Sequence, residues 1–263
     1  MTTHIMKQVR EFWDAQPCNS WHPELRVGDA KYFAELANRR YTVEPHIERF
    51  AQFNYWDNQE VLELGCGIGT DAVRFAKSGA RVMAVDMSET SLALARANAA
   101  CAKLNYSRIR FIVANLEQLN LADKRPWALI YAFGVLHHTP NPRVALDRIV
   151  EHMAPHTELR MMVYARHSWK SAMIDAGLDQ FEAASGCPVA YRYTEEQIKT
   201  LCASAGLEVI DFEQCHIFRY SIPEYKEGRL VELPWFTAMP VPVFRALERA
   251  LGWHLLIRAR KQT

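Results

Sequence analysis

Three glycines alternate with other residues in the stretch VLELGCGIGTDAVRFA, which covers positions 61–76. These are Gly65, Gly67 and Gly69, and they separate an apolar run from a segment with a helical pattern. Such a turn lets the backbone approach a ligand closely and is typical of nucleotide-binding loops before a helix. Dinucleotide-binding loops carry a third glycine where this chain has Thr70, and no Gly-Lys-Ser or Gly-Lys-Thr of a P-loop follows. The loop therefore predicts a nucleotide ligand and disfavours a pyrophosphate.

Asp86 is a second candidate, because it follows the apolar run RVMAV at positions 81–85, one strand-helix unit after the glycine loop. A carboxylate at the carboxyl end of a strand can accept hydrogen bonds from both hydroxyls of a ribose. The alternative is an acidic residue that is stabilised by the dipole of the following helix. In combination with the glycine loop, Asp86 favours a ligand with a free ribose.

Two adjacent histidines, His137 and His138, follow the apolar run ALIYAF at 128–133. Either imidazole can act as a general base or orient an acceptor, and the alternative is a local hydrogen bond to the backbone. Tyr164 ends another apolar run, and its ring can face a cation or pack in the core. Apart from His152 and His156, which are four residues apart, the ten histidines show no HxxxH or HxH spacing, and no His/Cys motif accompanies that pair, so we predict no metal site.

Short apolar runs alternate with helical patterns between Glu60 and Tyr164, and this arrangement must position the candidate residues. Runs without alternating polar residues leave no solvent-exposed face, which is typical of parallel strands that are covered by helices on both faces of a sheet. The predicted strands are 60–64, 81–85, 109–114, 128–133 and 158–164. A helix that begins after the N-cap Ser88 lies between two of them. The pattern predicts an α/β fold with a Rossmann-like, doubly wound sheet.

The remaining segments divide the chain into an arm and a main domain. Residues 1–55 predict an N-terminal helical arm or cover, and residues 56–263 predict the Rossmann-like domain. After position 164 we expect a helix at 194–206, a strand at 207–213, a helix at 243–251 and a closing strand at 253–259. Two segments rich in aromatic residues, at about 166–190 and 217–244, are predicted as lid insertions.

Composition restricts the classes of function. Of the 263 residues, 49% are hydrophobic and 23% charged, and the net charge of +1 provides no field to recruit nucleic acid or a membrane surface. No apolar stretch has the length of a signal peptide core or a membrane span, so we expect a cytoplasmic protein. The six scattered cysteines are interpreted as reduced thiols. Function must then depend on a local site.

Four segments in order, LELGCGIGT, VDMS, NLEQL and FGVLHHTPNP, resemble motifs of the class I S-adenosylmethionine (SAM) dependent methyltransferases. The resemblance is strong over about 60–165 and looser beyond. It implies a seven-stranded sheet with an antiparallel last strand, SAM as the cofactor and a small-molecule substrate. Two departures are Asn115, where the family often has an acidic residue, and MAPHTEL at 153–159, where it often has a Pro-Gly-Gly turn.

The resemblance also implies how SAM is held. Asp86 would bind the ribose, Asn115 would accept a hydrogen bond from the adenine amino group, and Phe133 would offer its carbonyl to the methionyl amine. Arg40 and Tyr41 in the arm would hold the methionyl carboxylate. The complete set of implied cofactor positions is Glu63, Gly65, Cys66, Gly67, Thr70, Asp86, Met87, Asn115, Leu116, Phe133, Arg40 and Tyr41.

Three functions remain open at this level. The first is transfer of the sulfonium methyl group to a small-molecule acceptor by in-line displacement, with His138, His137 and Tyr164 as candidate catalytic residues. The second is cyclisation of SAM itself to azetidine-2-carboxylate and methylthioadenosine, which would make SAM the sole substrate. The third is a SAM-binding module without catalysis. The glycine loop predicts the cofactor and does not distinguish these three.

Overall fold

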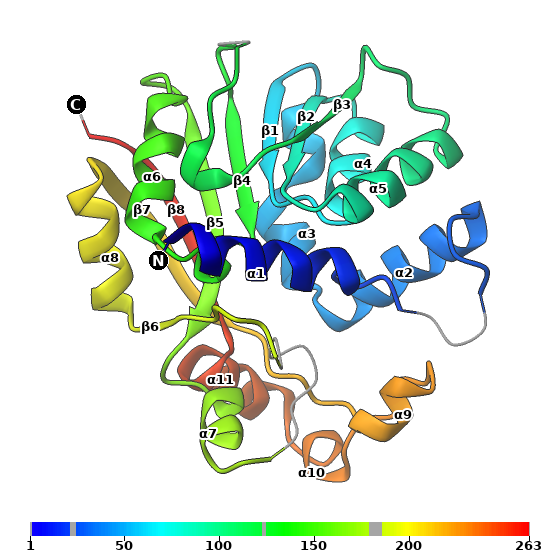
Figure 1. Cartoon of the computed structure of the whole chain (residues 1–263). Coiled ribbons are helices and arrows are strands. Elements are labelled where there is room, and N and C mark those ends of the chain that lie inside the picture. Colours follow the sequence, from blue (N-terminus) through cyan, green and yellow to red (C-terminus); the bar gives the residue numbers. More distant parts are fainter. Residues whose placement is uncertain (1, 22–24, 123–124, 179–185, 263) are drawn as a thin grey trace.

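A mixed sheet forms the centre of the molecule in a computed structural model, which describes residues 2–21, 25–122, 125–178 and 186–262 (Figure 1). The strand order is β3-β2-β1-β4-β5-β8-β7, and the short β6 pairs with β5 beside this path. The strands are β1 Glu60–Leu64, β2 Arg81–Asp86, β3 Ile109–Val113, β4 Leu129–Phe133, β5 Glu158–Ala165, β6 Arg192–Tyr193, β7 Leu207–Cys215 and β8 His254–Lys261.

The sheet confirms the predicted doubly wound topology. Strands β1 to β5 pair in parallel, whereas β8 is antiparallel to both β5 and β7. The predicted antiparallel last strand is therefore correct. The sheet has one more strand than the seven expected, because Tyr164 and Ala165 at the end of β5 pair with the two-residue β6. An isolated two-residue strand has no hydrophobic periodicity, so the sequence gives no signal for it.

Eleven α-helices and three short 3-10 helices are assigned among the described residues. The α-helices are α1 Thr2–Ala15, α2 Ala30–Val43, α3 His46–Ala51, α4 Thr70–Lys77, α5 Glu89–Cys101, α6 Pro142–Glu151, α7 Trp169–Asp175, α8 Glu195–Ser204, α9 Ile222–Lys226, α10 Pro234–Thr237 and α11 Val241–Leu251. The 3-10 helices are η1 Phe53–Trp56, η2 Leu116–Gln118 and η3 Leu136–His138.

Local sequence signals account for several helix ends. The Ser88 side chain accepts a hydrogen bond from the Ser91 backbone and caps α5, and Thr194 with Gln197 forms a capping box at α8. Helix α7 lies within the first predicted lid insertion and ends at Asp175, shortly before Gly177 with φ +74°. Positions 179–185 of that predicted lid lie outside the described residues.

Alternate residues of the strands pack into two cores, one on each face of the sheet. On one face Leu62 and Leu64 of β1 pack with Leu146 of α6 and Ile198 of α8. On the other face Val61 belongs to a core that α3, α4 and α5 complete. Period-2 alternation with both faces buried is what the apolar runs predict for parallel strands. This packing fixes the carboxyl ends of the strands, where ligands bind in such folds.

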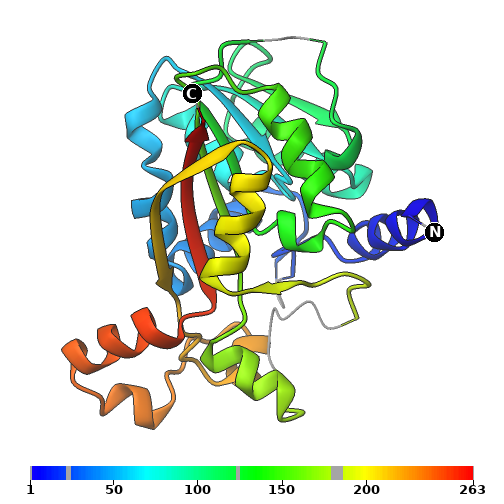
Figure 2. The ribbon, with the colours of Figure 1, turned by 90° about the vertical axis from the view of Figure 1, so that its left-hand side faces the viewer.

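The N-terminal and C-terminal helices lie at that end of the sheet. Figure 1 shows α1 crossing below the end of β4 and α2 to the right of it, and Figures 1 and 2 show the helices of the C-terminal part at the lower end of the molecule. Helix α1 docks on α5 through Arg10, whose Nη2 lies 3.1 Å from Glu89, and through Asp14, which accepts a 2.7 Å hydrogen bond from Ser88 Oγ. The arm is thus folded against the main domain.

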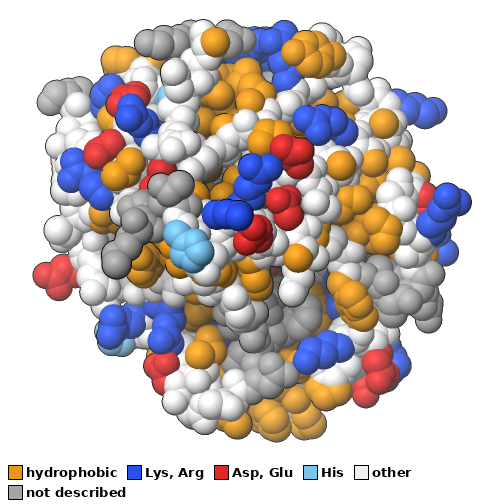
Figure 3. Space-filling model, in the orientation of Figure 1, with side chains coloured by type: hydrophobic (Ala, Val, Ile, Leu, Met, Phe, Trp, Pro, Cys, Tyr) orange, Lys and Arg blue, Asp and Glu red, His pale blue; other side chains and the backbone are white. Residues whose placement is uncertain are grey.

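The surface carries no dominant charge on the face in view. Figure 3 shows Lys and Arg side chains mixed with Asp and Glu over that face, in keeping with the net charge of +1. Among the described helices, none combines the length and apolarity needed to cross a membrane. All six cysteines are free thiols.

Candidate functional site

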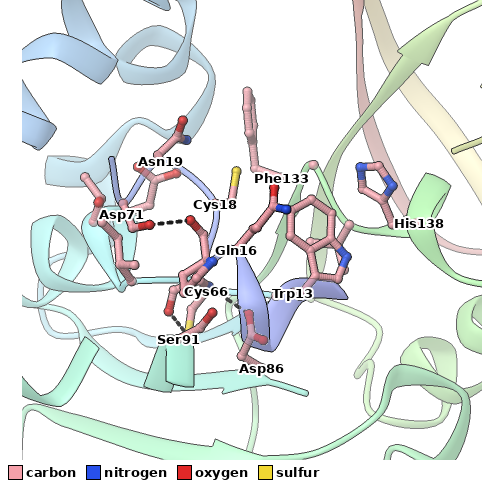
Figure 4. Close-up of a pocket in the computed structure, with 18 of the residues that line it drawn as sticks. Trp13, Gln16, Cys18, Asn19, Cys66, Asp71, Asp86, Ser91, Phe133 and His138 are labelled. Atoms are coloured by element: carbon pink, nitrogen blue, oxygen red, sulfur yellow. Dashed lines mark hydrogen bonds between the residues drawn. The ribbon is translucent and has the colours of Figure 1, made fainter. Parts of the chain in front are cut away.

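One cavity of about 860 Å³ is lined by residues at the carboxyl ends of β1, β2 and β4 and by residues of α1 and α2. All the predicted site residues line it except His137 and Tyr41. Figure 4 shows Asp86 and Cys66 of the nucleotide loops on one side and Trp13, Phe133 and His138 on another. Gln16 and Cys18, from the segment after α1, lie between them in this view. The sheet and the arm therefore build the cavity together.

The glycine loop has the conformation that its sequence predicts. Gly65 has φ +67°, and a Cβ atom there would lie 2.2 Å from Val135 Cγ2, so only glycine fits. Gly67 has φ +52° and no heavy atom within 4 Å of a Cβ position, so its backbone faces open space. The backbone N–H groups of Gly65 and Cys66 donate to the carbonyl of Val85. The loop thus leaves room for a ligand directly above its second glycine.

Asp86 is held by backbone donors beside this opening. Its Oδ2 accepts a 2.8 Å hydrogen bond from the Gly67 N–H, and its Oδ1 accepts one of 2.8 Å from the Ser88 N–H. Burial raises the pKa of this carboxyl, and the backbone hydrogen bonds oppose that effect. A carboxylate oxygen has two lone pairs, so each can still accept a ribose hydroxyl.

A group of charged side chains closes the opposite end of the cavity. Arg40 Nη2 donates to Asp71 Oδ2 at 3.0 Å, and the Tyr41 hydroxyl donates to Asp71 Oδ1 at 2.9 Å. Burial alone would lower the pKa of Arg40, but the Asp71 and Glu44 carboxylates raise it well above its usual value. Tyr41 thus contacts Asp71 and does not line the cavity, while Arg40 does.

Glu63 is the remaining acidic residue of this group, and it is almost fully buried. Burial raises the pKa of Glu63 well above its usual value, and the charges of Asp71 and Asp86 raise it further, while Arg40 opposes them. Its Oε2, like Nε of Arg40, has no hydrogen-bond partner among the described residues. A buried acceptor and a buried donor without partners indicate that a polar ligand completes the site.

The predicted adenine positions lie at the other side of the glycine loop. Met87, Asn115 and Leu116 all line the cavity. Oδ1 of Asn115 accepts a 3.0 Å hydrogen bond from the Glu117 N–H and caps η2. The predicted adenine acceptor therefore already carries one local hydrogen bond, which leaves its second lone pair for a ligand.

The two candidate histidines have different environments. His138 lines the cavity, its Nδ1 lies 2.7 Å from the Val189 carbonyl oxygen, and burial lowers its pKa to about 4. His137 is fully buried away from the cavity, with its ring centroid 3.7 Å from that of Tyr164. Tyr164 lines the cavity and stacks on Trp253. The geometry favours His138 over His137 as a base.

Several lining residues were not singled out from the sequence. Trp13 projects from α1 with its ring centroid 5.1 Å from His138, and Glu44, Trp253 and His254 line the wall near Phe133. The aromatic content of EFWDAQPCNSW did indicate a folded cover, but nothing in a single sequence specifies which rings face a cavity. Of the two predicted lid insertions, the second contributes Tyr225 and Lys226, whereas the described residues of the first contribute none.

Comparison with protein families gives a match over the central part of the chain, which includes the glycine loop and Asp86. Positions 61–156 match the family model described as a methyltransferase domain. A mitochondrial ubiquinone biosynthesis O-methyltransferase of Schizosaccharomyces pombe is 27% identical over 119 residues, which are 45% of this chain and 43% of that protein. The chain spans about half the length of the curated relatives it matches.

Solved structures resemble nearly the whole chain. A methyltransferase of Haloferax volcanii, in complex with the Trm112 methyltransferase activator, aligns with a TM-score of 0.64 and 16% identity over 97% of this chain and 98% of its own. The magnesium protoporphyrin IX methyltransferase of Synechocystis PCC 6803, solved with bound SAM, aligns with a TM-score of 0.60 and 13% identity over 98% and 97%. At these identities the likeness establishes the fold alone.

Proposed function

We propose that this chain, whose residues 61–156 belong to the methyltransferase domain family and have the class I SAM-dependent fold, transfers a methyl group from SAM to a small molecule. The observation that carries the proposal is the pair of buried, unpartnered atoms at the glycine loop, Glu63 Oε2 and Arg40 Nε. SAM has an ammonium and a carboxylate at its methionyl end, so it can satisfy both atoms at once.

The rest of the cavity fits the other parts of SAM. Asp86 would accept hydrogen bonds from the ribose hydroxyls, above the open backbone of Gly67. Asn115, with Leu116 beside it, would hold the adenine, and Phe133 lies where β4 ends at the methionyl part. When bound, SAM supplies an electrophilic methyl carbon on a positively charged sulfur. The protein must then place the acceptor in line with that bond and exclude water.

Aromatic rings form the acceptor side of the cavity. Trp13, Phe133, Tyr164 and Trp253 line it. Such walls suit an apolar or aromatic acceptor and can stabilise a nearby cation. Burial lowers the pKa of His138 to about 4, so its imidazole is neutral at pH 7 and has a free lone pair, although it is a weaker base than an exposed histidine. With a hydroxyl acceptor, the oxygen-methyl bond forms, the carbon-sulfur bond breaks and the hydroxyl proton passes to His138.

Transfer is favoured over cyclisation of SAM and over a non-catalytic module. The relative from Schizosaccharomyces pombe is an O-methyltransferase, and the cavity volume of about 860 Å³ is in the upper part of the ~300–1,000 Å³ range of ligand pockets. Cyclisation needs space for SAM only. A cavity of this size leaves room for an acceptor beside SAM, which methyl transfer requires and cyclisation does not.

The test is product analysis with purified protein. SAM is incubated alone and with a panel of small phenols and quinols, and the products are separated by mass. We expect S-adenosylhomocysteine together with a methylated phenol, formed only when an acceptor is present. Methylthioadenosine from SAM alone would replace this proposal with cyclisation, and unchanged SAM with every acceptor would contradict it for this class of molecule.

The binding part of the proposal has its own control. Asp86→Asn should weaken SAM binding in calorimetry by about tenfold or more, because a carboxylate is the stronger acceptor for hydroxyl groups. Asp147→Asn is the matched control, since Asp147 lies on α6 and contacts Arg143 at the surface. Equal SAM affinity in both variants would remove the ribose assignment.

A further inference from the structure

Four polar side chains from distant parts of the chain meet at one side of the cavity, and two of them line it. Glu44 follows α2, His46 begins α3, His216 follows β7 and His254 begins β8. All four are buried. One donor atom each of Glu44, His216 and His254 lies within 4.8 Å of the other two. Nε2 of His46 lies 2.9 Å from Nδ1 of His254.

We propose that Glu44, His216 and His254 bind a divalent transition-metal ion of the Zn²⁺ class, with His46 positioning the ring of His254. Two imidazoles and one carboxylate are the donor set of catalytic zinc sites that keep an open position. Tetrahedral ligands about 2.0–2.1 Å from zinc are roughly 3.3 Å apart, so the donor atoms need to approach by about 1.5 Å at most. Rotation of the side chains supplies a movement of this size.

The surroundings support a site for this kind of ion. Nε2 of His46 contacts Nδ1 of His254, which leaves Nε2 of His254 for the ion, and such an outer contact fixes the orientation of a metal-binding ring. The set contains two nitrogens and one carboxylate, which suits Zn²⁺ better than Mg²⁺, because Mg²⁺ prefers oxygen ligands in octahedral geometry. Among the described residues, this is the group of His, Cys, Asp and Glu whose donor atoms converge in this way.

Two positive side chains also face the cluster and set a limit on its affinity. Arg40 Nη1 lies 3.7 Å from Glu44, and Lys170 acts electrostatically on both His216 and His254. Both charges repel a dication, whereas the Glu44 carboxylate attracts it. Removal of the Lys170 charge should therefore tighten metal binding, an effect that ordinary core packing of the histidines does not predict.

The site opens towards the cavity on one side. Glu44 and His254 line the cavity, while His216 does not. A fourth coordination position would thus face the space beside Phe133, whose ring centroid lies 5.6 Å from that of His254. An oxygen donor, either water or a hydroxyl group of a small molecule, would fill it. Only this last use depends on the proposed methyl transfer; binding of the ion does not.

The experiment titrates the metal alone into the full chain. Protein is stripped with a chelator, dialysed and titrated with Zn²⁺, Co²⁺ or Mg²⁺ in a calorimeter, and Co²⁺ is also followed by its visible absorption. We expect about one equivalent of Zn²⁺ or Co²⁺, an absorption band of four- or five-coordinate Co²⁺ and no comparable Mg²⁺ binding. Absence of a stoichiometric Zn²⁺ site would overturn the proposal.

Variants identify the site. His216→Asn and His254→Asn should lose the Zn²⁺ site, His46→Gln should weaken it about 10–100-fold, and Lys170→Met should tighten it. His156→Asn is the control, because His156 is exposed. Thermal unfolding is measured for every variant, so that a folded protein without the metal site is recognised, and SAM affinity is measured separately. Zn²⁺ binding by His216→Asn equal to that of the control would also contradict the assignment. A protein that binds Zn²⁺ but not SAM would contradict the proposed methyl transfer and would leave the metal site as proposed.

Discussion

Arg40 of the N-terminal arm and Asp71 of the helix after the glycine loop form a buried ion pair, with 3.0 Å between Nη2 and Oδ2. Only 14% and 4% of their side chains are exposed. Glu44 lies 3.7 Å from Nη1 of the same arginine. The pair joins α2 to α4 at the end of the cavity that we assign to the methionyl group, so it connects the cover to the nucleotide loop.

Removal of one partner of this pair should be costly. Asparagine is neutral, so in Asp71→Asn the buried guanidinium of Arg40 loses the negative charge beside it. We expect the free energy of unfolding to fall by about 3–5 kcal/mol. SAM affinity should fall as well, because Tyr41 and Arg40 lose the acceptor that orients them. Chemical denaturation and calorimetry measure the two effects.

The matched control for the ion pair is exposed. Arg74 lies 3.0 Å from Glu48, with about half of each side chain exposed. Arg74→Gln should change stability by about 0–1 kcal/mol. A loss of the same size in Asp71→Asn would show that the Arg40 pair is no more important than a surface contact.

SAM binding should release a proton from Glu63. Burial, aided by the charges of Asp71 and Asp86, raises the pKa of this carboxyl, so the ligand-free site holds a proton there that a nearby ammonium would displace. Calorimetry in two buffers of different ionisation enthalpy gives the number of protons released. Glu63→Gln should abolish that release, and equal enthalpies in both buffers for the unmodified protein would contradict the assignment.

The sheet could be predicted from the sequence because each of its strands is a local apolar run. Glu60–Leu64 has the same bounds in prediction and structure, and the limits of the other main strands differ by only one or two residues. Most of the positions that the family resemblance implies for the cofactor lie on the same elements, at the edge where the carboxyl ends of the parallel strands meet. Local pattern thus determines the part of the cavity that the sheet builds.

The parts of the site that depend on distant contacts could not be predicted. No short spacing links His216 with Glu44, which are brought together only when β7 and α2 pack at the same end of the sheet. Two residues that are adjacent in the sequence can also have different environments. His138 lines the cavity, while His137 lies buried against Tyr164. Which of two neighbours faces a ligand depends on the turn at η3, and that turn is set by tertiary packing.

The stability of the protein should fall in mild acid through His138. Its folded-state pKa of about 4 lies below the unfolded value of ~6.5, so the unfolded state binds more protons between these values. Stability is therefore fully present above about pH 6.5 and is lost as the pH falls towards 4, by up to roughly 3 kcal/mol from this residue. Denaturant unfolding at successive pH values measures the slope.

His138→Gln should make that slope shallower, because glutamine does not titrate. The other buried histidines still contribute, so the slope decreases without vanishing. His156→Asn, which replaces an exposed histidine, serves as the control. An unchanged slope in His138→Gln would show that the pKa of this imidazole is not lowered by burial in the folded protein.

The cover formed by α1 should control how fast SAM leaves. Trp13 projects from this helix towards His138, and Asp14 beside it accepts the hydroxyl of Ser88, whose backbone N–H donates to Asp86. Trp13→Ala removes apolar contact over the cavity, and we expect roughly tenfold faster SAM dissociation, or about 1.4 kcal/mol, in stopped-flow fluorescence with a competing ligand. Tyr106→Ala is the matched aromatic control, because Tyr106 is 72% exposed and does not line the cavity. Equal dissociation rates in the two variants would mean that α1 covers the site without retaining the ligand.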